Sequence, residues 1–335
     1  MKKKFQDQLF LFIHKKLNSL LIVKKMKTYQ PLIAIACAFL LSCGGSNRQP
    51  TEATQKEESL EFPAELVDFS DYPDNPIFTG TGQSTWDEHI RERGYILKED
   101  SIYKMWYTGY RSEAGSLSLG YATSADGINW NRYPGNPVFD GSWTEDMMVI
   151  KVDGVYQMFA EGRGDIAHRL SSPDGIRWTD HGSLDIRLVN GEPLSEGPYG
   201  TPTAWFEEDV WYLLYERNDL GIWLATSKDL EVWTNVQDEP VIEMGPEEYD
   251  KYGLAVNQII KYDGTYYAYY HGTAFEDWHE WSTNVAASKD LVHWTKYEGN
   301  PIVGENRSSG ILVPDGSGFR LYTMHDQVDV FFPED

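Results

Sequence analysis

The chain has 335 residues, with 29 lysines and arginines against 52 aspartates and glutamates, which gives a formal net charge of −23. Residues 1–43 hold eight lysines and one acid, so almost all of the negative charge belongs to the rest of the chain. A surface that negative repels phosphate backbones and excludes nucleic acid as a partner. The 12 Trp, 21 Tyr and 14 Phe residues exclude a disordered chain.

The amino terminus has the features of a bacterial export signal. An unbroken run of ten apolar residues, 32–41, follows a lysine-rich flank. Ten residues are too few to span a bilayer, which needs about 20, but they fit the apolar region of a signal peptide. The run leads into Leu-Ser-Cys43-Gly-Gly, which resembles the lipobox of bacterial lipoproteins. We therefore expect residues 1–43 to be a lipoprotein signal peptide with lipidation at Cys43, and a start at Met26 would give it an ordinary length.

This assignment sets the expected location and the domain boundaries. We expect an exported bacterial lipoprotein at the cell membrane or outer membrane, periplasmic or on the cell surface, which meets the membrane only through its lipid anchor. A plain secretory signal is the alternative. Residues 44–61 are expected to form a flexible tether and residues 62–335 the folded catalytic domain. Both cysteines, Cys37 and Cys43, precede this domain, so it has no disulfide, no cysteine nucleophile and no cysteine-based metal site.

A repeated unit organises residues 65–333. Five times, a turn with an acidic residue precedes an aromatic-rich strand pattern, whose first aromatic residue we take as the marker of that repeat. The markers are separated by 53, 55, 55 and 53 residues, and they are Tyr103, Tyr156, Trp211, Tyr266 and Phe319. Spacing this even indicates an internal repeat.

A second motif, Ser-x-Asp-(Gly/Leu)-x-x-Trp, follows the marker in the first four repeats, at residues 124–130, 172–178, 227–233 and 288–294. Its aspartate suits a tight turn, because the carboxylate can accept backbone N–H hydrogen bonds, so we assign these aspartates a structural role. Units of this length with four short strand patterns predict an all-β fold, a five-bladed β-propeller with four-stranded blades. The strand around residues 69–78 is expected to complete the fifth blade.

Propeller geometry brings equivalent positions of different blades to one central mouth. Asp87 lies 16 residues before its marker and Glu196 lies 15 before its own, which places two carboxylates at similar offsets. The second blade supplies a third carboxylate, for which Asp146, Asp140 and Glu145 are the candidates. Acids packed together raise at least one pKa, as a general acid beside a general base requires.

Further side chains are expected around the same mouth as ligands of a sugar. The ends of the second strands supply carboxylates and imidazoles, and exposed aromatic side chains offer faces on which a sugar ring can stack. The predicted substrate-binding residues are Trp86, Glu145, Glu161, Arg163, Tyr199, Glu216, Asn257, His271 and His325, with Trp143, Trp278 and Trp281 as further stacking candidates.

Three stretches resemble the five-bladed glycoside hydrolases of family 43 and its relatives, including family 117. They are Trp-Asp87 before Met-Trp-Tyr-Thr-Gly, then Gly-Tyr-Ala-Thr-Ser-Ala-Asp-Gly-Ile-Asn-Trp, and then Ser-Glu196-Gly-Pro-Tyr. The resemblance implies an anomer-inverting hydrolase with Asp87 as the base, Asp146 as the carboxylate that tunes the acid, and Glu196 as the acid. In an inverting enzyme the base and acid carboxyls stand roughly 6.5–9.5 Å apart. The Asp-Pro usual at the base is replaced here by Asp-Glu.

The function implied by this resemblance is an exo-acting glycoside hydrolase of plant or algal polysaccharide fragments, such as a β-xylosidase or α-L-arabinofuranosidase. One alternative is a family 117-like 3,6-anhydro-galactosidase on agar-type oligosaccharides, with His271 or His325 as the acid. Another alternative is a non-catalytic glycan-binding propeller on the cell surface. No cofactor and no catalytic metal are implied, although a structural cation in the channel would match some relatives.

Overall fold

The computed structural model describes residues 60–111 and 117–334. The expected signal peptide (1–43), its lipidation site Cys43 and most of the expected tether (44–61) lie outside the described residues, so they stay predictions. Within the described part of the chain, no helix is both long enough and apolar enough to cross a bilayer.

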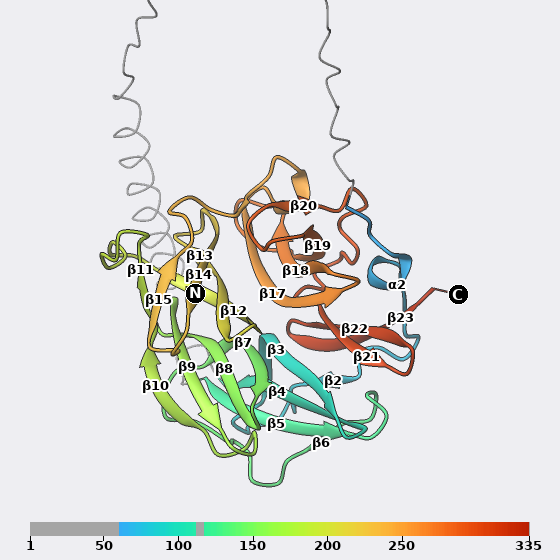
Figure 1. Ribbon diagram of the computed structural model, residues 1–335. Helices are drawn as coiled ribbons and strands as arrows, with labels where there is room; N and C mark the ends of the chain where they lie inside the picture. The colour runs from blue at the N-terminus through green and yellow to red at the C-terminus, as the bar shows by residue number, and fades with distance from the viewer. Residues whose placement is uncertain (1–59, 112–116, 335) are drawn as a thin grey trace, which may run out of the picture. The chain divides into compact units, whose positions relative to one another are not determined.

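Antiparallel sets of four strands follow one another along the described chain (Figure 1). The first repeat holds β3 (His89–Glu99), β4 (Ile102–Tyr110), β5 (Ser118–Ser124) and β6 (Asn131–Arg132). The second holds β7 (Glu145–Val152), β8 (Val155–Gly162), β9 (Ile166–Ser172) and β10 (Thr179–Ser183). The third holds β12 (Tyr199–Glu207), β13 (Val210–Arg217), β14 (Gly221–Ser227) and β15 (Val232–Asn235), with β11 (Asp185–Arg187) and β16 (Ile242–Glu243) added at its edge. The fourth holds β17 (Gly253–Tyr262), β18 (Thr265–Thr273), β19 (Ser282–Ser288) and β20 (Trp294–Lys296).

The fifth repeat is completed by the amino-terminal end of the domain. Its own strands are β21 (Ile311–Asp315), β22 (Gly318–Met324) and β23 (Gln327–Pro333). Two strands from the other end of the described chain, β1 (Phe69–Asp71) and β2 (Phe78–Thr79), pair with β23. The prediction that a strand around residues 69–78 closes the last repeat is therefore confirmed.

The fold is of the β-propeller type. Among the described residues the helical segments are short, α2 (Ala64–Val67) and η1 (Glu248–Asp250), and the rest is strand and turn. The second and third repeats are hydrogen-bonded into one ten-stranded sheet through a single parallel pairing of Tyr199 with Ile166. The count of five separate blades stays a prediction.

The aspartate of the repeated turn has the structural role expected of it. In the first repeat, Asp126 Oδ1 accepts hydrogen bonds from the Ser124 hydroxyl at 2.9 Å and from the backbone N–H groups of Ile128 at 2.9 Å and Asn129 at 2.8 Å. The same pattern recurs at Asp174, and in the third and fourth repeats. One carboxylate thus organises a turn whose N–H groups would otherwise lack a partner.

Asparagine side chains ahead of proline bind the third strand of their repeat. Asn136 Oδ1 accepts from the Tyr121 N–H and its Nδ2 donates to the Tyr121 carbonyl, both at 2.9 Å. Asn75 and Asn300 hold Val330 and Val285 in the same way. The amide side chain takes the place of a neighbouring backbone, so these residues are structural.

In the first and fifth repeats, the third residue after the marker contacts the turn of the neighbouring repeat. Trp106 Nε1 in the first repeat donates to the Gly175 carbonyl in the second at 2.7 Å. The Tyr322 hydroxyl in the fifth repeat donates to the Gly127 carbonyl in the first at 3.1 Å. These contacts between repeats fix how neighbouring sheets meet, and with them the positions of the inner strand ends.

Helix α2 takes the place of the turn that the fifth repeat lacks. The equivalent residue of the fourth repeat is Tyr269, which is fully buried and donates its hydroxyl to the Leu66 carbonyl of α2 at 2.7 Å. Leu66 is itself fully buried. The segment ahead of β1 is therefore part of the repeat-to-repeat packing.

We expect Tyr269→Phe and Tyr322→Phe to lower the free energy of unfolding by similar amounts, about 1–1.5 kcal/mol each, because each change leaves a buried carbonyl without its donor. Chemical denaturation of both variants beside the unaltered protein measures this. Stability unchanged in Tyr269→Phe and lowered in Tyr322→Phe would show that α2 does not replace the missing turn.

Candidate active site

The innermost strands of four repeats carry a β-bulge near their first residues. The strand register shifts at residues 91–95, 145–148, 200–203 and 256–258. Three residues in these bulges, Arg93, Asp146 and Thr201, have left-handed backbone with φ of 54°, 47° and 46°. A bulge bends the strand and re-aims the side chains beside it. Polar residues of several repeats are thereby directed to one place.

Three acids of the second repeat lie together where β7 begins and β8 ends. Glu145 is paired in register with Glu161, and Asp146 follows in the bulge. The Glu161 carboxylate accepts hydrogen bonds from the Thr201 N–H at 2.9 Å and from the Thr201 hydroxyl at 3.1 Å. Glu145 forms an ion pair with Arg91 of β3. The acids therefore connect the first three repeats.

These acids compete for ionisation. Burial raises the pKa of Asp146 well above its usual value, and the charges of Glu92 and Glu145 raise it further. Burial and the charge of Asp146 likewise hold the pKa of Glu161 well above its usual value. Burial also raises the pKa of Glu145, although Arg91 opposes this. Like charges in a poorly solvated site cannot all form. The raised pKa values favour a proton on Asp146 and on Glu161, and Asp146 is the one of these two with an unpaired carboxyl oxygen.

Glu92 on β3 is the ionised member of the group. Its Oε2 lies 3.1 Å from His325 Nδ1. Burial alone would raise the pKa of Glu92, but the hydrogen bond and charge of His325, together with Arg91, bring it below its usual value. Burial opposes protonation of His325, yet the contact with Glu92 raises the pKa of this imidazole. The Glu92 side chain is 33% exposed, so water reaches this carboxylate.

Arg93 and His271 add one buried cation and one neutral imidazole. Arg93 is fully buried, and its Nη2 donates to the Pro202 carbonyl at 2.9 Å and to the Thr203 hydroxyl at 2.6 Å. Burial lowers its pKa to about 10, so it stays charged at neutral pH. Burial, together with the charge of Arg93, lowers the pKa of His271 to about 3. Neutral His271 can therefore accept at Nδ1 the hydrogen bond of Asn257 Nδ2, 3.0 Å away.

Several buried polar atoms here lack a hydrogen-bond partner among the described residues. They are Arg93 Nε and Nη1, Asp146 Oδ1 and Asn257 Oδ1. Buried polar atoms are normally bonded, so unpaired ones gathered at one place indicate a site for a hydrogen-bonding ligand or for water. We call the group the central cluster, and it comprises Arg91, Glu92, Arg93, Glu145, Asp146, Glu161, Asn257, His271 and His325.

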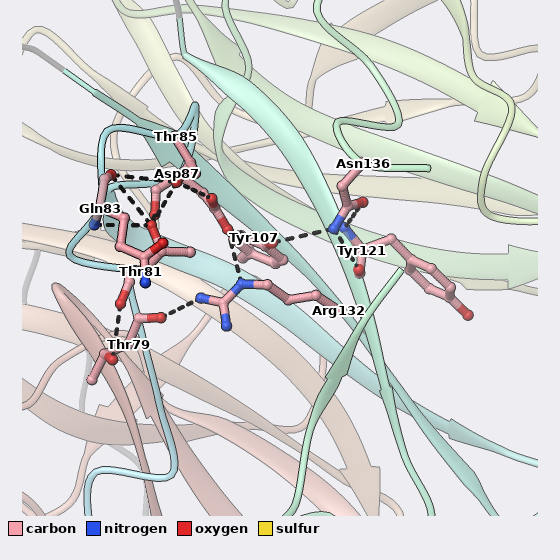
Figure 2. A network of polar contacts seen from close by, with 10 residues as sticks. Thr79, Thr81, Gln83, Thr85, Asp87, Tyr107, Tyr121, Arg132 and Asn136 are labelled. Carbon is pink, nitrogen blue, oxygen red and sulfur yellow. Dashed lines mark hydrogen bonds and ion pairs between the residues drawn. The ribbon is translucent and has the colours of Figure 1, made fainter. Parts of the chain in front are cut away.

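Asp87, the expected base, is held in a different network (Figure 2). Its carboxylate is buried and accepts from the Thr85 hydroxyl at 2.9 Å, the Tyr107 hydroxyl at 3.1 Å and Arg132 Nε at 2.8 Å. Arg132 lies on β6, the outermost strand of the first repeat, and also donates to the Thr79 carbonyl. The described contacts of Asp87 thus tie the loop before β3 to the outer part of its own repeat.

Glu196, the expected acid, lies in the segment between β11 and β12 and its side chain is exposed. The charged groups with the largest effects on the pKa of Asp146 are Glu92, Glu145, Arg93 and Arg91. Neither Asp87 nor Glu196 is among them. The structure therefore brings Asp146 together with Glu92, and the roles given to Asp87 and Glu196 stay predictions.

Other expected sugar ligands fall into two groups. Glu145, Glu161, Asn257, His271 and His325 belong to the central cluster. Trp86 stacks on Tyr107 with ring centroids 5.7 Å apart, inside the first repeat. Glu216 is buried and accepts a hydrogen bond from the Asp219 N–H, and the Tyr199 hydroxyl donates to the Leu184 carbonyl. The rings of Trp281 and His271 are nearly perpendicular, with their centroids 4.9 Å apart.

Sequence reasoning missed Glu92. Arg93, Asp146 and Thr201 each lie ten residues before their markers, and Glu92 and Glu145 each lie eleven before theirs. This shared distance is the register of the inner strands, and it was available in the sequence. Asp87 and Glu196, which lie 16 and 15 residues before their markers, belong instead to the connecting loops ahead of the inner strands. Because the lengths of these loops differ between repeats, similar distances there do not indicate equivalent positions.

Two surface hollows are found beside the repeats that contribute to the central cluster. One, of about 570 Å³, is lined by residues of the fifth repeat and the segment after β1, and includes His325. The other, of about 450 Å³, is lined by the second repeat and includes Trp143 and Arg163. Within residues 60–111 and 117–334, no group of three or more His, Cys, Asp or Glu residues is placed to hold a metal ion. The expectation about cofactors stays a prediction.

No family model matches the chain. The 1,2-β-oligomannan phosphorylase of Thermoanaerobacter sp. (strain X514) is 25% identical over 219 residues, which cover 59% of this chain and 69% of that protein. The solved β-1,2-mannobiose phosphorylase of Listeria innocua is 14% identical with a TM-score of 0.63, and the match covers 79% of this chain and 96% of that one. A second solved structure is described by the statement that the GH130 family of mannoside phosphorylases contains glycoside hydrolases that target β-1,2-mannosidic linkages in Candida mannan. It is 15% identical with a TM-score of 0.64, covering 81% and 95%.

These likenesses support a β-propeller-type fold shared with glycoside-processing enzymes. The three relatives are described as mannoside phosphorylases or in terms of mannoside hydrolases. None of them is described as belonging to family 43 or family 117. The wider resemblance to glycoside hydrolase propellers is supported, and the narrower one to those two families is not.

The ion pair in the central cluster can be tested by titration. We expect the Cε1 proton signal of His325 in NMR spectra to titrate above the ordinary histidine pKa of about 6.5. In Glu92→Gln the midpoint falls, because a neutral amide no longer stabilises the imidazolium. Glu88→Gln, a nearby acid outside the cluster, serves as the control and leaves the midpoint in place. A midpoint that does not move in Glu92→Gln would contradict the pairing.

Proposed function

We propose that the protein is an enzyme that cleaves β-linked mannosides, with Asp146 as the proton donor. The observation that supports this proposal is that the central cluster contains one carboxyl group with a raised pKa and another with a lowered pKa. Asp146 is kept protonated by burial and neighbouring acids, while Glu92 is kept ionised by His325. A general acid beside a carboxylate base is what cleavage of a glycosidic bond requires. The names of the relatives supply the sugar. The mannoside specificity replaces the expected xylosidase or arabinofuranosidase activity.

In the hydrolytic reaction, Asp146 gives its proton to the glycosidic oxygen as the bond from that oxygen to C1 breaks. Glu92 takes a proton from water while the water oxygen bonds to C1 from the opposite face, which inverts the anomeric centre. His325 holds the Glu92 carboxylate in place. Neutral His271 and the unpaired atoms of Asn257 and Arg93 provide hydrogen-bonding groups for sugar hydroxyls. The proposal includes a propeller of five blades, because that arrangement would place the inner strands of all the repeats around one central channel.

Phosphorolysis is the second candidate. Two of the relatives are named as phosphorylases, and the central cluster contains cations, of which Arg91 is 41% exposed on its side chain. In this reaction a phosphate oxygen bonds to C1 in place of water, and the product is a mannosyl phosphate. Asp146 again gives its proton to the leaving oxygen. An ionised Glu92 beside these cations favours water over phosphate as the nucleophile.

The prediction of an exported lipoprotein stays part of the proposal and rests on the sequence alone. Lipidation at Cys43 would place the enzyme at a membrane surface with access to mannan fragments. The alternative of a surface glycan-binding protein without activity is distinguished from the enzyme by the next experiment.

We expect Asp146→Asn to lower kcat on β-1,2-mannobiose by about 10²- to 10⁴-fold, the usual contribution of a general acid. On 2,4-dinitrophenyl β-mannoside the loss is much smaller, because that leaving group departs without a proton. Asp153→Asn, in an exposed turn of the same repeat, is the matched control and keeps full activity. Equal losses on both substrates would assign Asp146 a structural role, and no turnover by the unaltered protein would remove the proposed function.

The nucleophile is identified by the first-formed product. Proton and phosphorus NMR of reactions with and without inorganic phosphate distinguish free mannose from mannosyl phosphate. We expect free mannose of inverted configuration at an equal rate in both, and a tenfold or greater reduction of that rate in Glu92→Gln. Mannosyl phosphate formed only when phosphate is added would select the second candidate.

A further inference from the structure

The hollow over the second repeat has the features of a prepared sugar site. Its volume of about 450 Å³ falls within the range of about 300–1,000 Å³ usual for small-molecule sites. Its walls come from the segment before β7, the end of β8, the start of β9 and the end of β10. They are polar and of mixed charge, with Asp140 and Asp180 facing the same space as Arg163.

Two buried polar atoms in these walls have no hydrogen-bond partner among the described residues. They are Ser142 Oγ and His168 Nε2. The His168 side chain is only 5% exposed, and burial lowers the pKa of its imidazole. A neutral imidazole and a hydroxyl each both donate and accept hydrogen bonds. They suit a neutral ligand rich in hydroxyl groups, and leaving them unpaired is costly.

The hollow is linked to the central cluster through Trp143. The Trp143 indole N–H donates to Glu145, which is paired with Arg91. The guanidinium of Arg163 lies over the Trp143 ring, 4.8 Å from its centroid. The Trp143 ring thereby holds Arg163 at the hollow, while the indole N–H contacts Glu145, the residue before Asp146.

We propose that this hollow binds the sugar units on the leaving-group side of the cleaved bond. This inference rests on the proposed function. The hollow and Asp146 belong to the same repeat. Because the proton donor must face the leaving oxygen, the sugar units on the leaving-group side are expected on the side of this repeat. The bound group is a neutral hexopyranose continuing the substrate chain, with its hydroxyls on Ser142, His168 and Arg163. The enzyme then prefers oligosaccharides to the disaccharide.

The test compares β-1,2-linked mannobiose, mannotriose and mannotetraose as substrates. We expect kcat/KM of the unaltered protein to rise roughly five- to tenfold with chain length. Ser183→Trp fills the hollow from its exposed rim and abolishes this rise, and Ser142→Ala reduces it. His181→Phe, on the same strand as Ser183 but outside the hollow, is the control and keeps the rise. A length preference that survives in Ser183→Trp would overturn the inference while leaving the proposed function in place.

Calorimetric titration with mannotetraose gives a second readout that does not depend on turnover. Asp146→Asn binds the tetrasaccharide, and adding Ser183→Trp to that variant weakens binding at least fivefold. Thermal melting confirms that both variants are folded. Equal affinity in the two variants, or no binding by either, would overturn the inference. Binding that is lost on filling the hollow, in a protein that cleaves no mannoside, would support the subsite and refute the enzyme.

Discussion

The crowding of acids at the inner ends of the strands is the constraint on which the site depends. Four carboxyl groups lie within one cluster, and each can ionise only if a cation or solvent compensates its charge. Glu92 contacts His325 and Glu145 contacts Arg91. Arg93 and Arg91 lower the pKa of Asp146, but burial and the neighbouring acids raise it by more, which favours the protonated form. Contact with a cation lowers the pKa of Glu92, whereas burial outweighs Arg91 at Glu145 and keeps the pKa values of Asp146 and Glu161 high.

The outer parts of the repeats allow this arrangement to persist. A cluster of like charges tends to spread apart, and the hydrogen bonds available inside it are few. The restraint comes from elsewhere, through turns held by aspartates and strands held by the asparagine that precedes proline. Buried contacts such as Trp106 with Gly175 then fix each repeat against the next.

The repeat period, the structural turns and the closing amino-terminal strand could all be predicted from the sequence. Each depends on local chemistry, such as an aspartate facing the N–H groups two and three residues on, and each recurs with a constant spacing. The candidate site depends instead on where a bulge re-aims a side chain. Asp146 was predicted as the third carboxylate of the site through the family resemblance, whereas Glu92, between two arginines, resembles a solvated charge.

Asp87 is a different case, because its predicted role as the base is neither supported nor contradicted by its contacts. Its place beside Trp86 and ahead of an aromatic strand matched a familiar pattern, and it is buried as a catalytic acid would be. Burial alone does not identify a reacting group, because a buried carboxylate can also serve to hold its neighbours in place. Asp87 accepts three hydrogen bonds, from Arg132, Tyr107 and Thr85, which leaves fewer of its acceptor sites for a substrate. Unpaired atoms, as on Asp146, distinguish the two cases, and only side-chain packing reveals them.

The ionised Glu92 also bears on the choice between water and phosphate. A phosphate dianion bound near Arg91 would meet the negative charge of Glu92, and the repulsion would favour a proton on that carboxylate. Because linkage is reciprocal, protonation of Glu92 must strengthen phosphate binding by the same factor. Water carries no charge and imposes no such penalty, and it needs the base that a protonated Glu92 could not supply. On the proposed function, the ionised form of Glu92 therefore serves hydrolysis and its neutral form would favour phosphorolysis, so the contact with His325 favours water as the nucleophile.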